Sequence, residues 1–195
     1  MGAKFSGVMG MSFQFLNRTV ASVLAIVLLS TVCWAADQDK LDRLYGQLQD
    51  AEPAEARRVA KEIELEWSKS GSPAMDLLLK RGTDAMEAGD FASAIGHFTA
   101  LTDHAPDFAE GWHRRAVAFA ASEMYGPAVD DLRHALELNP RHYDAIAALG
   151  GILVKIEKPE VAAQAFQQVL AIHPHYREVT EALEHLDSQT GGADL

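Results

Sequence analysis

The sequence holds a single cysteine, Cys33, among its 195 residues. One cysteine cannot close a disulfide within the chain, so the fold must be stabilised by packing. It also excludes any metal centre built on several thiolates. Hydrophobic residues make up 48% of the sequence, which is enough to bury a core and argues against wholesale disorder.

Basic residues are also scarce. The chain has 17 Lys and Arg against 28 Asp and Glu, a formal net charge of −11. A nucleic-acid-binding protein needs a concentrated basic surface to displace counterions from phosphates. The acids here are spread along the chain, so we expect no nucleic-acid partner.

Acidic residues are absent from residues 1–36. Lys4 and Arg18 precede an apolar run over residues 20–32, and small residues follow it. A positive flank, a short apolar run and small residues, in that order, are typical of a secretory signal peptide. We therefore predict a signal peptide over 1–35 and export to the bacterial periplasm. Cleavage after Ala35 is favoured over cleavage after Ala36, which would put the bulky Trp34 at a position that needs a small residue.

Two other interpretations of this segment remain open. The run is shorter than the roughly 20 apolar residues of a spanning helix, but a stretched segment could stay as an uncleaved inner-membrane anchor with the domain facing the periplasm. Cys33 could instead carry a lipid, although Val32 before it fits that signal badly. We expect membrane contact only if the segment is retained.

Beyond the N-terminus, residues of matching size recur every 34 positions. Small residues, bulky residues and prolines each keep this period, and the series are Gly82, Ala116 and Gly150; Ala94, Ala128 and Ala162; Phe98, Leu132 and Phe166; and Pro106, Pro140 and Pro174. Three units follow in register: 75–108, 109–142 and 143–176. Chance does not produce this coincidence of four series.

These positions resemble the tetratricopeptide repeat (TPR) family, whose unit is a 34-residue helix–turn–helix. The resemblance implies an all-α fold, a right-handed superhelical solenoid of helical hairpins. The residues themselves support it. Trp112, Ala116 and Phe119 share one helix face, and small Ala116 opposite small Ala128 allows two helices to approach closely. Asp107 is the expected N-cap of the second unit's first helix.

The flanks continue the helical pattern weakly. Two helices are predicted within 37–74, at Asp39–Asp50 and Ala54–Trp67, as a degenerate repeat or an N-terminal cap. In this segment Leu48 occupies a position that is small in the other units, and Glu64 one that is bulky. An amphipathic capping helix is expected over 177–189, with a tail at 190–195.

The TPR resemblance implies a concave, protein-binding groove lined by five positions of each first helix. We expect its partner to be an unidentified protein or peptide that presents an apolar helix or an extended segment. The Lys and Asn clamp with which some TPR domains grip chaperone tails is missing. An alternative is that Leu79 or Met86 packs against the N-terminal helices. The predicted groove residues are Asp76, Leu79, Thr83, Met86 and Glu87; Glu110, His113, Val117, Ala120 and Ala121; and Asp144, Ala147, Gly151, Val154 and Lys155.

No catalytic or cofactor motif is present in the sequence. Asp90, Ser93 and His97 have triad chemistry, but they fall at a turn and on one helix, so we predict no enzymatic activity and no cofactor. Pro174 separates His173 from His175 and argues against a metal pair. A metal or small-ligand site on the histidines is the weaker alternative.

Arg81 and Arg115 recur at the same repeat position, which could indicate a pair that reads a ligand. For Arg115 a structural ion pair with Asp131 is favoured, because Arg–carboxylate geometry suits a helix–helix contact.

Together these features predict an exported TPR adaptor or scaffold in the cell envelope that binds a protein through its groove. The alternative is a membrane-anchored structural docking module.

Overall fold

The computed structural model describes residues 39–190 of the chain. The chain divides into two compact units, Met1–Arg43 and Leu44–Leu195. Of the first unit, residues 39–43 are described and are helical. The predicted signal peptide or anchor, and the tail beyond Thr190, lie outside the described residues. Within the described part, no helix has the length and apolar character needed to cross a membrane.

The described residues form helices and turns, with no strand among residues 39–190. The all-α solenoid expected from the repeat is confirmed. A first helix runs through residue 50 and is described from residue 39. The helices that follow are α2 (Pro53–Trp67), α3 (Pro73–Glu87), α4 (Phe91–His104), α5 (Ala109–Ala121), α6 (Tyr125–Leu138), α7 (Tyr143–Lys155), α8 (Pro159–Ile172) and α9 (Arg177–Thr190).

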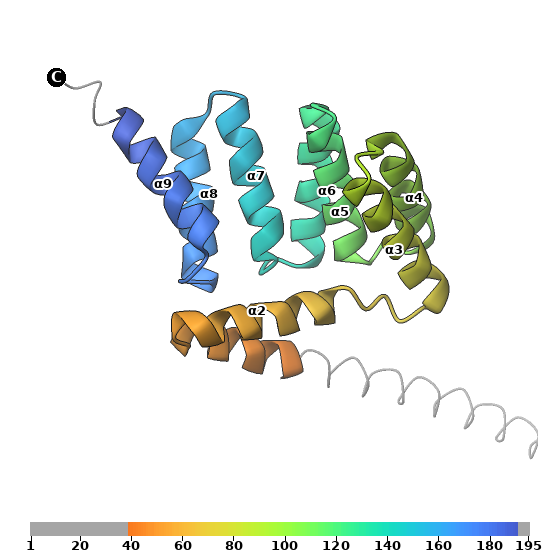
Figure 1. Cartoon of the computed structure of the whole chain (residues 1–195), viewed down its shortest axis with the longest axis horizontal. Helices are drawn as coiled ribbons and strands as arrows, with labels where there is room; N and C mark the ends of the chain where they lie inside the picture. Colours follow the sequence, from red (N-terminus) through yellow and green to blue (C-terminus); the bar gives the residue numbers. More distant parts are fainter. Residues whose placement is uncertain (1–38, 191–195) are drawn as a thin grey trace, which may run out of the picture. The chain divides into compact units, whose positions relative to one another are not determined.

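Helices α3 to α8 form three hairpins that follow one another in space (Figure 1). Each hairpin pairs a first helix with its second helix: α3 with α4, α5 with α6, and α7 with α8. The first helices also contact one another, α3 with α5 and α5 with α7, so they form one layer. Helix α9 packs on α8, where the sequence predicted a capping helix.

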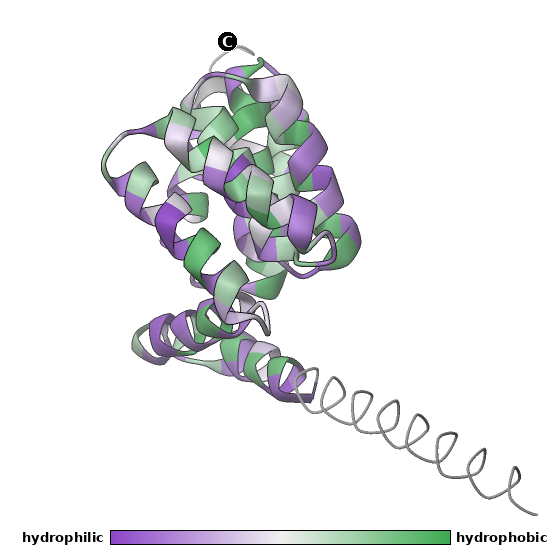
Figure 2. Cartoon of the chain, turned by 90° about the vertical axis from the view of Figure 1, so that its right-hand side faces the viewer, coloured by the Kyte–Doolittle hydropathy of each residue, from purple (hydrophilic) through white to green (hydrophobic). Residues whose placement is uncertain are grey.

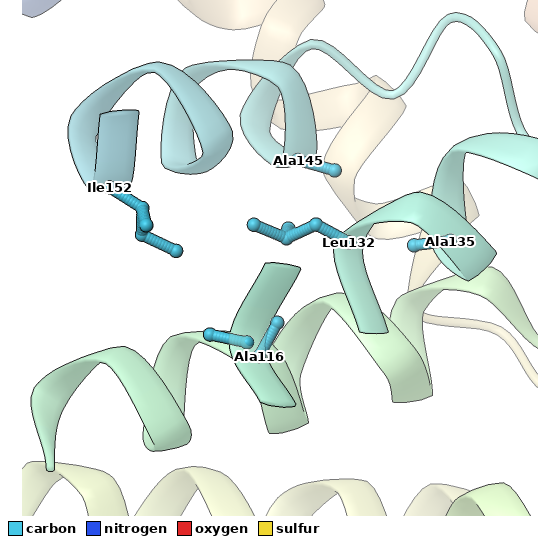
Figure 3. Close-up of a cluster of buried hydrophobic side chains, with 6 residues drawn as sticks. Ala116, Leu132, Ala135, Ala145 and Ile152 are labelled. Carbon is cyan, nitrogen blue, oxygen red and sulfur yellow. The ribbon is translucent and has the colours of Figure 1, made fainter. Parts of the chain in front are cut away.

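Each helix is amphipathic, and hydrophobic and hydrophilic residues alternate around the ribbons in Figure 2. One core cluster lies between α5, α6 and α7, with Ala116, Ala128 and Leu132 completely buried. Figure 3 shows Leu132 pointing between Ala116 of α5 and Ile152 of α7. The predicted contact of Ala116 with the α6 stripe is confirmed, because the small side chains let the helices approach closely.

In each unit, the close approach of the two helices depends on a pair of facing residues whose sizes are matched. A Cβ added to Gly82 would lie 2.3 Å from Phe98, and one added to Gly150 would lie 2.4 Å from Phe166. In the middle unit the smaller Leu132 takes the place of the phenylalanine, and Ala116 takes the place of the glycine. A larger residue on one helix therefore requires a smaller one on its partner.

The turn inside each hairpin contains one residue with a positive φ. Gly89 has a φ of 74° in the first unit, where glycine tolerates this conformation. At the same repeat position Glu123 has a φ of 60° and Glu157 a φ of 58°. A side chain is disfavoured there, so the second and third turns carry backbone strain that the first avoids.

The predicted N-cap of α5 is wrong. Helix α5 begins at Ala109, its N-cap position is Phe108, and no side chain caps it. Phe108 turns inward and packs against the core cluster beside Leu101, close to Gly111. This apolar contact, rather than a cap from Asp107, fixes the start of the helix.

The N-terminal helices do not continue the stack as a preceding repeat would. Helix α2 contacts the start of α7 instead: Tyr143 donates a hydrogen bond to the backbone oxygen of Ala60, and Trp67 stacks on His142 at 4.0 Å between ring centroids. From the helix before α2, Tyr45 donates to the backbone oxygen of Arg141. The pair is therefore bound to the junction between the second and third units.

Candidate functional site

The predicted groove residues differ in how exposed they are in the structure. Six are exposed: Asp76, Glu87, Ala121, Gly151, Val154 and Lys155. Six are half-buried: Thr83, Met86, Val117, Ala120, Asp144 and Ala147. Three are buried: Leu79, Glu110 and His113. The exposed members lie on α3, α5 and α7, the layer of first helices.

The apolar members on α3 belong to the repeat core. Leu79 lies in the cluster that contains Phe98 and Leu101 of α4, and Met86 packs against the same cluster. Their packing is therefore within the first hairpin, and not the contact with the N-terminal helices that was left open. Of the apolar groove residues, Val154 is 38% exposed and so accessible to a partner.

Glu110 and His113 lie in a buried polar cluster at the start of α5. Oε2 of Glu110 is 3.1 Å from Nδ1 of His113 and 2.8 Å from Nε2 of His142. The other carboxylate oxygen accepts a hydrogen bond from Nε of Arg114. Burial disfavours the charged carboxylate, but the charge of His113, the hydrogen bonds from both imidazoles and the Arg114 charge together hold the pKa of Glu110 well below its usual range.

The same cluster brings together three possible metal ligands, since the ligand atoms of Glu110, His113 and His142 lie within 4.8 Å of one another. The backbone N–H of Ala145 donates to Nδ1 of His142, so the ring proton is on Nε2, which donates it to Glu110. A metal at Nε2 would need the lone pair that this proton occupies. The arrangement is that of a hydrogen-bonded network, in which burial and the charge of His113 lower the pKa of His142.

A cleft of about 750 Å³ lies beside this cluster. Helix α2 forms one wall, and the first residues of α7 and α9 form the other. Asp144, one of the predicted groove residues, lines it, so the cleft adjoins the groove. The lining residues are Pro53, Arg57, Ala60 and Glu64; Tyr143 and Asp144; and His173, Pro174, His175, Tyr176, Arg177, Glu178 and Thr180.

Two of the three carboxylates that line the cleft, Glu64 and Asp144, act on its two tyrosines. Tyr176 donates a hydrogen bond to Asp144 at 2.9 Å. Burial and the nearby charge of Asp144 raise the pKa of Glu64. Burial, followed by the charge of Asp144, raises the pKa values of Tyr143 and Tyr176, so both hydroxyls stay protonated. The charges of Glu64 and Asp144 therefore act on each other in a partly desolvated cleft.

His173 and His175 both line this cleft. His173 is 6% exposed and His175 is exposed. Nδ1 of His173 is buried and has no hydrogen-bond partner. Burial lowers its pKa, which favours the neutral ring.

Sequence reasoning missed most of the cleft. Tyr143 and Tyr176 occupy the first and last positions of the third unit, and Glu64 stands where the other units have a bulky apolar residue. That departure is visible in the sequence, but nothing in the sequence indicates that α2 would face α7 and α9.

The predicted ion pair of Arg115 with Asp131 is confirmed. Nε and Nη2 of Arg115 donate to the two carboxylate oxygens of Asp131 at 2.7 and 2.8 Å, and Nη1 donates to Thr102 at 2.9 Å. Arg81 has no such partner, because His97 stands where the second unit has Asp131. Arg115 therefore has a structural role, because its hydrogen bonds link α5 to α6 and to α4.

Two of the three residues with triad chemistry, Asp90 and Ser93, have a structural role at the start of α4. Asp90 is the N-cap of α4 and accepts hydrogen bonds from the backbone N–H and the hydroxyl of Ser93. These hydrogen bonds lower the pKa of Asp90, chiefly through the Ser93 hydroxyl. Such contacts satisfy the free donors of a helix N-terminus.

Comparison with known proteins gives a family match and several relatives. A family model described as "Tetratricopeptide repeat" matches residues 79–126. A TPR repeat-containing protein of Rhizobium etli is 30% identical over 81% of this chain and 78% of its own length. DnaJ homolog subfamily C member 3 of Bos taurus is 32% identical over 55% of this chain, which spans 21% of that protein.

Solved structures share the fold. The first TPR domain of RPAP3, solved with the HSP90 peptide SRMEEVD, has a TM-score of 0.58 and 23% identity, over 60% of this chain and 95% of that one. The TPR2B domain of yeast Sti1 in a Hsp70 complex has a TM-score of 0.57 and 18% identity, over 60% of this chain and 99% of that one.

Proposed function

Because the chain belongs to the tetratricopeptide repeat family, we propose that it is an exported adaptor that holds another polypeptide on its first helices. The observation that carries the proposal is the layer formed by α3, α5 and α7, which leaves the groove residues of their later turns uncovered. The solved TPR domains of RPAP3 and Sti1 are complexed with Hsp90 or Hsp70 segments, and this supports a polypeptide ligand here.

The charge of the groove favours a different polypeptide from those tails. SRMEEVD ends in an acidic group, whereas the uncovered and half-buried groove residues here include Asp76, Glu87 and Asp144. Lys155 is the one Lys or Arg among the predicted groove positions. An acidic tail would meet like charges. A segment with apolar anchors, in contact with Val154 and the half-buried Val117, fits this surface.

Two substitutions of the same kind test the groove. Val154→Glu places a charge on a first helix, and Val161→Glu places the same charge on a second helix; the two valines are 38% and 48% exposed. A partner that buries Val154 would have to bury an unpaired carboxylate, which costs several kcal/mol. We expect cross-linking and capture from whole envelopes to recover a protein with wild type and with Val161→Glu, but not with Val154→Glu. Equal recovery by both variants would refute the proposal that the partner binds in the groove.

Export is the second part of the proposal, and it is supported by residues 1–36, with their basic flank, apolar run and small residues. We expect the mature chain to begin after Ala35, as measured by mass spectrometry of the protein from fractionated cells. A full-length chain in the membrane fraction would instead favour the anchored docking module. A cytoplasmic full-length chain would contradict both.

A further inference from the structure

Three aromatic rings line the cleft beside α2. Tyr143, His173 and Tyr176 form a triangle with centroid separations of 5.3 Å, 6.0 Å and 5.3 Å, and each pair meets edge to face. Tyr143 is 1% exposed and His173 6% exposed, so Tyr176 offers the accessible ring of the three. The face of such a ring carries negative potential and attracts ammonium and guanidinium groups.

Two of the carboxylates at the same cleft form no direct ion pair. Glu64 of α2 and Asp144 of α7 line it, and neither has an ion-pair partner within the described residues. Arg57 and Arg177 also line the cleft, and Arg114 acts electrostatically on both carboxylates. Arg114 pairs with Glu110, Arg177 pairs with Glu178 and Glu181, and Arg57 is exposed two turns before Glu64 on α2.

A third polar group at the cleft also lacks a partner. His173 is 94% removed from solvent, since 6% of its surface is exposed, and its Nδ1 has no hydrogen bond. A buried nitrogen without a partner is costly unless something binds it. A neutral imidazole can accept a hydrogen bond from an ammonium or guanidinium N–H. Because Nδ1 is itself buried, the His173 ring has to turn toward the cleft for this nitrogen to reach a ligand.

We propose that the cleft formed by Glu64, Asp144 and the Tyr143–His173–Tyr176 triangle binds the cationic head of a lysine or arginine side chain of the partner polypeptide. The inference rests on the proposed function, because Asp144 belongs both to the cleft and to the groove surface on which the polypeptide lies. The side chain enters beside the first turn of α7, and its apolar stem packs on the half-buried ring of Tyr176. An acidic side chain in the same place would be repelled by both carboxylates.

The test is an NMR titration of the full-length chain with Nα-acetyl-lysine methylamide, its arginine counterpart and the uncharged norleucine counterpart. Lysine or arginine should shift the resonances of Tyr143, Asp144 and Tyr176, and norleucine should not. Glu64→Gln and Asp144→Asn keep the size of each side chain and should each weaken binding about tenfold, the loss expected for one charged hydrogen bond. Glu62→Gln, on the same helix but paired with Arg58 outside the cleft, should leave the affinity unchanged.

Four outcomes would overturn the proposal. The first is equal binding of norleucine and lysine, and the second is an equal effect of Glu62→Gln and Glu64→Gln. The third is tighter binding of free choline than of either amino-acid amide, which would assign the cleft to a small free cation. A titration without shifts at the cleft would also remove the subsite. It would leave the groove intact, because the Val154→Glu and Val161→Glu comparison measures the groove separately.

Discussion

Gly150 and Phe166 offer a quantitative test of how the repeats are packed. A Cβ at Gly150 would lie 2.4 Å from Cε1 and 2.7 Å from Cδ1 of Phe166, where real contacts rarely fall below 3 Å. Phe166 is 4% exposed, so its ring has little room to move. Overpacking of this kind costs about 1–3 kcal/mol, and alanine recovers up to about 1 kcal/mol of helix propensity. We expect Gly150→Ala to lower the free energy of unfolding by about 1–2 kcal/mol.

The second unit of the same chain shows how the clash can be relieved. There Ala116 faces Leu132, and both are fully buried in one cluster. In a Phe166→Leu background, Gly150→Ala should therefore no longer clash and should stabilise the protein by up to about 1 kcal/mol. The coupling between the two substitutions should be about 2 kcal/mol, within the range of residues in contact.

The assay is urea unfolding followed by far-UV circular dichroism on the four proteins of the cycle. Gly151→Ala is the matched control, because it lies next to Gly150 on α7 and its added Cβ meets nothing within 4 Å. That control should stabilise the chain equally in both backgrounds. The reasoning is refuted if the effects of Gly150→Ala and Phe166→Leu add to within about 0.5 kcal/mol.

Three further predictions concern strain, the buried ion pair and pH. Glu157→Gly should raise the free energy of unfolding by about 0.5–1 kcal/mol in urea unfolding, because glycine adopts the φ of 58° at this position without strain. A lower free energy of unfolding would contradict the claim that this turn is strained. Asp131→Ala should cost about 3 kcal/mol by the same assay, since it leaves Arg115 unpaired with a side chain only 14% exposed, whereas a change below about 1 kcal/mol would argue against the ion pair. Burial lowers the pKa values of His142 and His173, so the folded chain binds fewer protons than the unfolded chain around their ordinary value of 6.5. The contribution of these histidines to stability should therefore be fully present above that value and fall as the pH drops below it, by at most about 1.4 kcal/mol per pH unit and histidine. His173→Gln should make the free energy of unfolding depend less steeply on pH. A stability that is flat or rises as the pH falls from about 7 to 5 would contradict the lowered pKa values of the two histidines.

The repeat made most of the fold predictable. The 34-residue period places small residues of one helix opposite large residues of the next helix. Because these side chains must pack closely, they determine how the helices of each hairpin lie against one another. The pairing of Arg115 with Asp131 could be predicted for the same reason, because both belong to one hairpin and their spacing is set by the repeat.

The position of α2 could not be predicted, because the helix departs from the repeat at the residues that would have stacked it. Leu48 is fully buried where the other units have a small residue, and Glu64 faces a cleft where they have a bulky apolar one. The contacts that fix α2 join residues far apart in sequence, such as Tyr143 with Ala60 and Trp67 with His142. No periodicity links such pairs, so the cleft emerged only from the structure.

Photo-cross-linking at single positions tests the central claim most directly. A photoreactive phenylalanine analogue is placed at Val154, on a first helix, or at Leu138, on a second helix; the two residues are 38% and 39% exposed. Irradiation of living cells should give one cross-linked protein from position 154 and none from position 138. A product at 138 alone, or the same product at both, would contradict the claim that the first helices hold the partner.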